Sequence, residues 1–348
     1  MTTASMKQDN LVARVRGALG LDDADEVVEV ARIGAGQVAE CHRIVFHRGD
    51  GDVAVVAKSP SSDETSRFTA SAQRLYLRET AFYRELQGDV DIRTPRPLHV
   101  EHDEETDDFL IILEDLTPAR TVDQFTGLSK QDAELALSEL AGLHAPTVGR
   151  TELHDSVWLR GVADETLPMY AMVLPALFDQ FLDRYDDALS ERTREVVSRL
   201  KGVLGSFSDH SPAVAAVVHG DYRTDNMIFG GRGGEVPLAI VDWQTTMVTS
   251  PMLDVAYFIT TSLTPADRAE HEESLIDHYL AEMSARGISF PVGAARREYA
   301  RYTLQPVVML VAASVIVERT ERGDRMFLTM IDRAVDAVEQ WDAFEVIG

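Results

Sequence analysis

Hydrophobic and β-branched residues alternate with polar ones along much of the first 60 positions. Three such runs are separated by glycine-containing breaks, and a later segment holds two more runs joined by an acidic turn: residues 27–33, 39–46, 52–59 and 95–116. Because side chains alternate between the two faces of a strand, this pattern predicts an antiparallel meander and a hairpin. Residues 62–86 instead carry apolar side chains at three- and four-residue steps, which predicts a helix. The N-terminal part is therefore expected to contain five strands and one helix.

Beyond residue 116 the spacing of apolar residues becomes that of long helices. Helices are expected at residues 130–144, 167–185 and 191–207 and in several segments after residue 265. Two short apolar runs that end in polar clusters, VVHGDYRTDNMIFG and VPLAIVDWQ, predict a small hairpin within this helical part. The natural boundary is EDLTPAR, at residues 114–120. We therefore predict an α+β, bilobal fold, with a small antiparallel-sheet lobe at residues 1–116 and a larger, mainly helical lobe at residues 117–348.

Composition limits the classes of partner. The chain has 348 residues, 45% of them hydrophobic, which is enough to bury a substantial core. Its 58 acidic and 33 basic residues give a net charge of -25, which disfavours nucleic acid and anionic membranes as partners. The single cysteine, Cys41, excludes an intramolecular disulfide and a cysteine-rich metal site. The apolar stretch Leu304 to Val317 is shorter than the ~20 residues of a membrane-spanning helix. A cytoplasmic protein is expected, and the oligomeric state stays open.

The sharpest chemical signal is HGDYRTDN, in which Asp221 precedes Asn226 by five positions. Asp242 follows a glycine-rich turn and ends the apolar run LAIV. Phosphoryl transfer to a hydroxyl needs one carboxylate that accepts the proton, and an amide oxygen and a second carboxylate that hold Mg²⁺. Asp221 or Asn226 alone is explained as well by a role in a turn. Together they predict Asp221 as catalytic base and Asn226 and Asp242 as metal ligands.

Three segments carry a resemblance to a known family. HGDYRTDNMIF, IVDWQ and PMLDVAYF resemble the aminoglycoside and choline phosphotransferase superfamily, especially its ecdysteroid-kinase-like branch. The resemblance covers most of the chain and implies a protein-kinase-like fold, with ATP or GTP as phosphoryl donor and Mg²⁺ as cofactor. It also implies that His219 and Asp254 brace the catalytic loop.

The N-terminal part supplies an independent test, because a kinase needs a strand lysine on the nucleotide phosphates and a helical glutamate that holds it. Lys58 ends the run VAVVAK, in which every other residue is apolar. Glu79 interrupts the apolar face of the expected helix at residues 62–86. A carboxylate on a buried face costs several kcal/mol, roughly, unless it is paired. We therefore expect Lys58 and Glu79 to contact each other and to serve catalysis, with Lys58 also binding the nucleotide.

Two further segments are candidates for nucleotide binding. IGAGQVAE lies between two expected strands, where Gly34 and Gly36 would let the backbone approach the phosphates, although a plain hairpin turn explains them equally well. LIILEDL ends the last expected strand of the small lobe. Its resemblance to family hinges implies that adenine contacts backbone groups near Glu114 and Leu116.

The acceptor is expected to be a hydroxyl of a small metabolite, natural product or antibiotic. Only 12 positions separate Asp242 from Asp254, which leaves little room for the activation segment of a protein kinase. Acidity would favour a cationic alcohol such as an aminoglycoside. Five aromatic residues would favour an apolar alcohol such as a steroid if they lined a pocket rather than the core: Trp158, Tyr170, Phe178, Phe181 and Tyr185.

A catalytically silent, kinase-like binding protein or scaffold is the alternative function. The complete set of chemical groups argues against it, because a silent fold has no need for all five: Lys58, Glu79, Asp221, Asn226 and Asp242.

Overall fold

A computed structural model describes residues 3–22, 24–34, 38–49, 51–160, 167–317 and 319–347. The chain divides into two compact units. The first contains Met1–Asp89, Arg93–Ala119 and Gly230–Gln244, and the second contains Val90–Ile92, Arg120–Phe229 and Thr245–Gly348. Compared with the predicted division at residues 116 and 117, the first unit therefore gains a segment from late in the chain. That segment carries Asp242, which joins the first unit together with Lys58 and Glu79.

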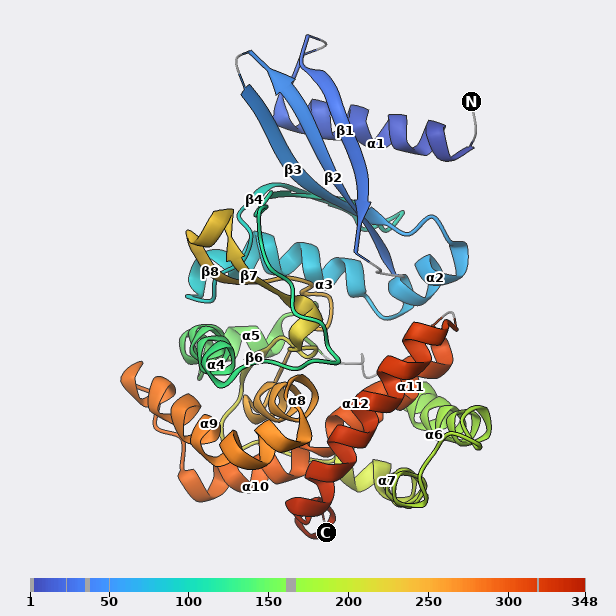
Figure 1. Ribbon diagram of the computed structural model, residues 1–348, viewed down its shortest axis with the longest axis vertical. Helices are drawn as coiled ribbons and strands as arrows, with labels where there is room; N and C mark the ends of the chain where they lie inside the picture. Colours follow the sequence, from blue (N-terminus) through green and yellow to red (C-terminus); the bar gives the residue numbers. More distant parts are fainter. Residues whose placement is uncertain are drawn as a thin grey trace. The chain divides into compact units, whose positions relative to one another are not determined.

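The first unit is built on a five-stranded antiparallel sheet with the order β1-β2-β3-β5-β4 (Figure 1). Its strands are Glu26–Ile33, Ala39–Arg48, Gly51–Pro60, Pro97–Asp103 and Asp108–Glu114, numbered β1 to β5 along the chain. A helix that was not among the elements counted above, α1 (Thr3–Leu19), packs on this sheet. Its Leu11 and Val15 share a buried cluster with Ile44, Phe46 and Val55, because the inward faces of the strands alternate as expected.

The helix predicted at residues 62–86 is wrong as a single element. The structure contains α2 (Glu64–Ala72), α3 (Leu75–Ala81) and a π-helical turn at Phe82–Leu86. The break lies at Arg74, whose backbone is left-handed with φ 56°. The change of direction leaves Phe68 of α2 77% exposed, while Glu79 of α3 is 2% exposed. Only the second half of the apolar stripe therefore faces the core.

Helices form most of the second unit: α4 (Lys130–His144), α5 (Thr151–Asp155), α6 (Leu167–Arg184), α7 (Glu191–Ser208), α8 (Met252–Ser262), α9 (Pro265–Ala285), α10 (Val292–Tyr302), α11 (Leu304–Ile316) and α12 (Glu321–Gln340). Four of them begin after a Ser or Thr whose hydroxyl accepts a hydrogen bond from the backbone N–H three residues later: Ser129, Ser190, Thr264 and Thr320. Such caps satisfy backbone donors that the first helical turn leaves unpaired. The local sequence therefore sets where these helices start.

At the centre of the second unit lies α8, all of whose residues are buried (Figure 1). It packs against α9, α10, α11 and α12, which explains why it carries almost no charge. Its one acidic residue, Asp254, is 0% exposed. Two short strands, β6 (Ala216–Val218) and β9 (Met247–Thr249), pair antiparallel in the second unit. The predicted hairpin is formed by β7 (Met227–Gly231) and β8 (Val236–Ile240), but Gly230–Gln244 belongs to the first unit and not to the helical part. The buried carboxylate of Asp254 in α8 therefore requires hydrogen-bonding partners.

One apolar segment, Gly293–Ile316, is long and apolar enough to cross a membrane by length and composition alone. Within the described residues, 61% of its most apolar window is buried in the protein. The segment divides at Thr303 into α10 and α11. Burial of this kind is typical of core helices, as expected for Leu304 to Val317.

The aromatic residues considered for an acceptor pocket belong to the core. Trp158, Phe178, Phe181 and Tyr185 are each 5% exposed or less. The side chain of Tyr170 lies outside the described part of the chain. The core alternative therefore holds for the four described aromatics, and they do not define the acceptor.

Candidate functional site

Lys58 lies on β3 between two carboxylates of the same unit. Its Nζ donates to Glu79 on α3, at 2.7 Å from Oε1 and 2.6 Å from Oε2, and to Asp242 Oδ1 at 2.9 Å. The side chains are 10%, 3% and 30% exposed, in the order Lys58, Glu79, Asp242. The contact predicted between Lys58 and Glu79 is confirmed. Asp242, assigned above to the metal, joins the pair as its most accessible member.

The electrostatics of this cluster follow from burial and proximity. Burial alone lowers the pKa of Lys58, but the charges of Asp242 and Glu79 outweigh it and hold that pKa well above its ordinary value. Burial raises the pKa of Glu79 despite the nearby ammonium. Lys58 therefore stays charged. The two carboxylates and one ammonium together leave one negative charge beside a partly exposed oxygen, which suits a divalent cation.

The segment that carries Asp242 is held on both sides. Asp242 has a left-handed backbone with φ 71°, and its Oδ2 accepts from Gln244 Nε2 at 3.3 Å. Trp243 stacks face to face on Phe82, with ring centroids 3.7 Å apart and planes within 4°. The backbone N–H of Trp243 also donates to Glu79. The same helical segment therefore positions both the lysine partner and the residue next to Asp242.

Cys41 is a neighbour of this cluster that the sequence analysis missed. It lies on β2 directly opposite Lys58 of β3 in the antiparallel register. Burial raises the pKa of the Cys41 thiol to about 11. The thiol therefore remains protonated at neutral pH and acts as a small apolar side chain. Strand register would have indicated the pairing, since RGDGD between the two strands fixes a short connection.

Of the residues predicted to bind the nucleotide, Gly34 has φ 72°, and a side chain added there would meet nothing within 4 Å. Gly36 lies outside the described residues. The Glu114 side chain is buried and accepts from Arg93 Nη2 at 2.6 Å, from the Arg96 N–H at 2.8 Å and from Arg232. This carboxylate is therefore committed to the protein itself.

The backbone at the end of β5 is partly engaged as well. The Glu114 N–H donates to the Arg96 carbonyl at 2.9 Å, and the Leu116 carbonyl accepts from the Arg232 N–H at 2.8 Å. No described residue accepts a hydrogen bond from the Leu116 N–H. That group is therefore the backbone donor on which an adenine contact near Leu116 would depend.

In the second unit, Asp221 and Asn226 are tied together in the loop after β6. The Asn226 amide nitrogen donates to the Asp221 carbonyl at 2.8 Å and to Asp221 Oδ2 at 3.0 Å. Residues Thr224–Asn226 form a 3-10 turn that closes the five-residue spacing. Because both bonds use the nitrogen, the Asn226 oxygen is directed away from Asp221 and is the atom able to bind a cation.

Two further residues contact Asp221. Arg223 donates from Nε to both carboxylate oxygens, at 3.1 and 3.2 Å, and from Nη1 to Asp225. The buried Tyr257 of α8 shares a side-chain hydrogen bond with Asp221. Arg223 follows Asp221 by two positions and lies within the motif HGDYRTDN, although no role was predicted for it. Tyr257 is distant in sequence and was not predicted, although it lies within PMLDVAYF.

Asp254 holds the backbone of the same loop. Its carboxylate accepts from the N–H of His219 at 2.6 Å and of Gly220 at 2.8 Å, and it lies 3.3 Å from His144 Nε2. The other ring nitrogen of His144 is bonded to the Tyr279 hydroxyl at 2.8 Å. His144, the last residue of the helix expected at residues 130–144, is thus buried and in contact with the residue that organises the loop.

Gly220 is required in this loop for two reasons. Its φ is 84°, and a Cβ added there would lie 2.4 Å from the backbone oxygen of Thr245. The Thr245 hydroxyl donates to the His219 carbonyl at 2.8 Å. The backbone around Asp221 is therefore in close contact with the chain that follows Asp242 and Gln244.

The sequence profile of the ecdysteroid kinase-like family matches residues 37–287, which is more than half of the chain. The chain belongs to the ecdysteroid kinase-like family. The predicted resemblance is therefore confirmed. A comparison with curated proteins gave no match.

Solved structures similar to this family member include several phosphotransferases. The choline kinase LicA of Streptococcus pneumoniae shares 14% identity, with 96% of this chain and 99% of that chain covered and a TM-score of 0.54. Spectinomycin phosphotransferase APH(9)-Ia, solved with ADP and spectinomycin, shares 13% identity, with 96% of this chain and 98% of that chain covered and a TM-score of 0.53. The GDP complex of aminoglycoside 2'-phosphotransferase-IIIa shares 14% identity, with 97% of this chain and 99% of that chain covered and a TM-score of 0.54. At these identities the likeness establishes the fold, and the predicted α+β, kinase-like architecture is confirmed.

The donor chemistry of this ecdysteroid kinase-like protein fits Mg²⁺. The cation prefers hard oxygen ligands, and it is commonly bound by one or two protein groups while phosphates and water complete its shell. The Asn226 amide oxygen and the Asp242 carboxylate are such groups. The described residues contain no cluster of three or more His, Cys, Asp or Glu that could hold a metal without a ligand. Asn226 and Asp242 therefore stay the predicted metal ligands.

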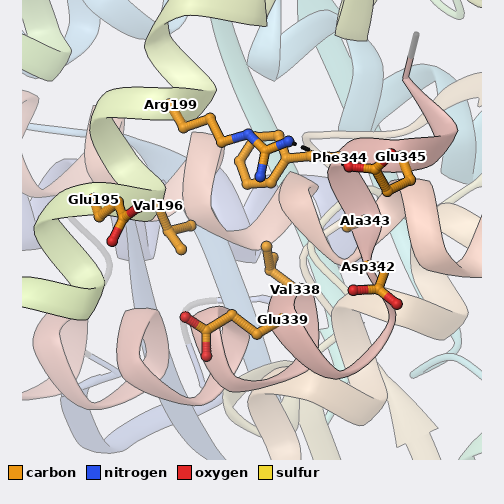
Figure 2. A pocket seen from close by; sticks show the side chains of 9 residues that line it. All are labelled: Glu195, Val196, Arg199, Val338, Glu339, Asp342, Ala343, Phe344 and Glu345. Atoms are coloured by element: carbon orange, nitrogen blue, oxygen red, sulfur yellow. Dashed lines mark ion pairs between the residues drawn. The ribbon is translucent and has the colours of Figure 1, made fainter.

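Two cavities lie elsewhere in the second unit. One of about 210 Å³ is lined by α7, the end of α12 and the 3-10 helix Ala343–Val346 (Figure 2). There Arg199 lies 4.1 Å from the Phe344 ring centre and 3.5 Å from Glu345. The other, of about 380 Å³, is lined by His210, Arg297 and Arg301 among others. Neither contains a predicted site residue of this family member.

Proposed function

We propose that the protein is a cytoplasmic, Mg²⁺-dependent kinase that transfers the γ-phosphoryl group of ATP or GTP to a hydroxyl of a small molecule. The observation that carries this proposal is the buried contact of Lys58 with Glu79 and Asp242. Burying Lys58 and Glu79 beside Asp242 is costly unless these groups serve one another or a ligand. Membership of the ecdysteroid kinase-like family supports the same chemistry.

In the proposed enzyme, Lys58 neutralises the nucleotide phosphates while Glu79 holds it in place. Asn226 and Asp242 would hold Mg²⁺, which supplies charge neutralisation at the phosphates when it is bound. The Leu116 N–H would contact the base of the nucleotide. These roles agree with the accessibility of each group, since Asp242 is the most exposed member of its cluster and the Leu116 N–H has no partner among the described residues.

Asp221 acts as the catalytic base in this proposal. The acceptor oxygen forms a bond to the γ-phosphorus, its proton passes to Asp221, and the bond to the β-phosphate oxygen breaks, which releases the nucleoside diphosphate. The hydrogen bonds from Arg223 and Asn226 orient the carboxylate for this step. Asp254 supports it through the loop backbone.

For the acceptor we propose an apolar alcohol before a cationic one. In the second unit, α6 packs against α11, which packs against α8, the helix of Tyr257. Large apolar side chains on α6 and α11 are exposed: Met172 79%, Val173 45% and Ile316 49%. Met172 and Val173 are adjacent in sequence on α6, and exposed apolar side chains that lie together commonly mark a binding surface. This supports an acceptor with an apolar body, and screening decides between the two classes.

The experiment incubates purified protein with labelled ATP or GTP, Mg²⁺ and a pooled library of alcohols that includes steroids and aminoglycosides, and identifies phosphorylated products by mass. We expect a product from wild type and a ~10²- to 10⁴-fold slower rate from Asp221→Asn, since the base is lost. The matched control is Asp187→Asn, the same change at an exposed position. Nucleotide binding without turnover on any pool would favour the silent alternative. A product from an aminoglycoside would overturn the preference for an apolar acceptor.

A further inference from the structure

The guanidinium of Arg223 is only partly used by the protein. Its Nε is committed to Asp221 and its Nη1 to Asp225. Among the described residues, no hydrogen bond or ion pair engages Nη2, although the side chain is only 19% exposed. Within the described part of the chain, Nη2 has no partner and is not one of the polar atoms that are buried without one, so it is accessible to solvent. A well-ordered arginine therefore presents one open donor group.

The open group lies next to the candidate base. A guanidinium is planar, and Nη2 shares an edge with the Nε–H. Because Nε–H donates to both oxygens of Asp221, the Nη2 donor is held beside that carboxylate. Asp225 fixes the opposite side of the guanidinium and prevents the plane from turning. In a kinase, the oxygen that attacks the phosphorus approaches the base, so a donor held beside the base carboxylate is suited to contact the phosphoryl group.

Holding Asp221 does not require an arginine. Asn226 already donates to Asp221 Oδ2, and Tyr257 shares a hydrogen bond with the same carboxylate. A neutral donor at position 223 would complete the set without a buried cation. The guanidinium adds a positive charge and a second N–H pair, and these match the planar oxygens of a phosphoryl group in transfer.

We propose that Arg223 is a catalytic residue that donates from Nη2 to the oxygens of the phosphoryl group during transfer. This inference rests on the proposed kinase function. Arg223 gives up no proton: the acceptor oxygen bonds to phosphorus, its proton goes to Asp221, and the bond to the leaving diphosphate breaks. As the phosphoryl group moves between the two oxygens, its charge is spread over the equatorial oxygens, and a cation placed there lowers the barrier.

The test measures binding of Mg²⁺ and ADP with and without aluminium fluoride, which mimics the phosphoryl group in transfer and needs no known acceptor. For Arg223→Met we expect unchanged affinity for Mg²⁺ and ADP and at least a ~100-fold loss of the added affinity from aluminium fluoride, the scale of one lost transition-state donor. Arg223→Lys is expected to recover part of that loss. Arg286→Met is the control, since Arg286 pairs with Glu282 on α9 and has comparable exposure, 31%.

A second background separates contact from mere orientation of the base. In Asp221→Asn, the carboxylate that Arg223 would orient is gone. If Arg223 touches the phosphoryl group, adding Arg223→Met to this variant still lowers aluminium fluoride binding by a similar factor. If it only positions Asp221, the second substitution changes nothing, and the proposal is wrong.

The two failures can be told apart. Wild type that binds neither ADP nor GDP in the presence of Mg²⁺ would overturn the proposed kinase function. Wild type that binds the aluminium fluoride complex tightly, with Arg223→Met binding it equally well, would overturn the role of Arg223 alone.

Discussion

Lys58 and Glu79 form an ion pair that is almost completely withdrawn from solvent, with side-chain exposures of 10% and 3%. The pair joins β3 to α3, two elements of one unit. Removing one member of such a pair leaves the other charge buried without compensation, whereas removing both charges is far less costly. Removing Lys58 alone and removing both charges are therefore expected to have different effects on the free energy of unfolding.

Lys58→Met is expected to lower the free energy of unfolding by about 3–5 kcal/mol at pH 8. Glu79 would then be buried without its cation, and burial already raises the pKa of Glu79. A group whose folded pKa is raised favours folding while protonated and loses that contribution as pH rises, so the damage should be smaller at pH 5.5 than at pH 8. Urea unfolding at both pH values measures this.

The double variant Lys58→Met with Glu79→Gln should recover much of the lost stability, since the one charge left in the cluster, Asp242, is 30% exposed. Lys130→Met serves as the control, because Lys130 and Glu134 form an exposed pair at 3.7 Å that contributes at most about 1 kcal/mol. Equal destabilisation by Lys58→Met at the two pH values would argue against an uncompensated Glu79 carboxylate.

Gly220→Ala is expected to disrupt the loop of Asp221. The positive φ alone costs about 1–3 kcal/mol for a residue with a side chain, and the added Cβ would lie 2.4 Å from the Thr245 oxygen. Because the loop must shift, activity should fall together with the melting temperature. Differential scanning fluorimetry and the transfer assay measure the two effects.

The matched control is Gly202→Ala in α7. There an added Cβ meets nothing within 4 Å, and alanine favours the helix interior over glycine by about 1 kcal/mol. The same chemical change should therefore raise stability at one glycine and lower it at the other. A neutral result at Gly220 would mean that the loop can relax without cost.

The sequence predicted the strands, most helices and the lysine contact, because each depends on local periodicity or on one buried charge. It missed the break at Arg74, since a left-handed conformation at a residue other than glycine has no signal in the apolar spacing, which continues from Phe68 to Glu79. The correct expectation for Glu79 therefore rested partly on a stripe that the structure interrupts. Tyr257 could not be assigned for a different reason, because its contact with Asp221 depends on how α8 packs.

Cys41 should be unreactive in the folded protein at neutral and mildly alkaline pH. With the pKa of the thiol raised to about 11 by burial, its thiolate at pH 8 is at least ~100-fold scarcer than that of an ordinary cysteine, whose pKa is about 8.5. Iodoacetamide should therefore label the folded protein slowly at pH 8 and faster only as the pH approaches 11. Protein unfolded in urea is the control and should react at the ordinary rate.

The same shift predicts a pH dependence of stability. Because the folded pKa of Cys41 lies above the unfolded value, its contribution is complete below about pH 8.5 and is lost as the pH rises toward 11. Cys41→Ala should remove this part of the alkaline loss. Fast labelling of the folded wild type at pH 8 would contradict a thiol that stays protonated.

Tyr257→Phe tests whether a buried hydroxyl matters for the candidate base. Burial and then the Asp221 charge raise the pKa of Tyr257 well above its ordinary value, so the hydroxyl stays protonated and donates at every working pH. Its loss removes one hydrogen bond to a carboxylate, about 1.5–3 kcal/mol, and leaves the oxygen of Asp221 freer to turn toward Arg223. We expect the turnover rate to fall by about 10- to 100-fold while affinity for the nucleotide is unchanged. Tyr302→Phe, which removes a hydroxyl contact to Thr249 at 3.3 Å, is the control. Equal rates for the two variants would show that Arg223 and Asn226 orient Asp221 without help from α8.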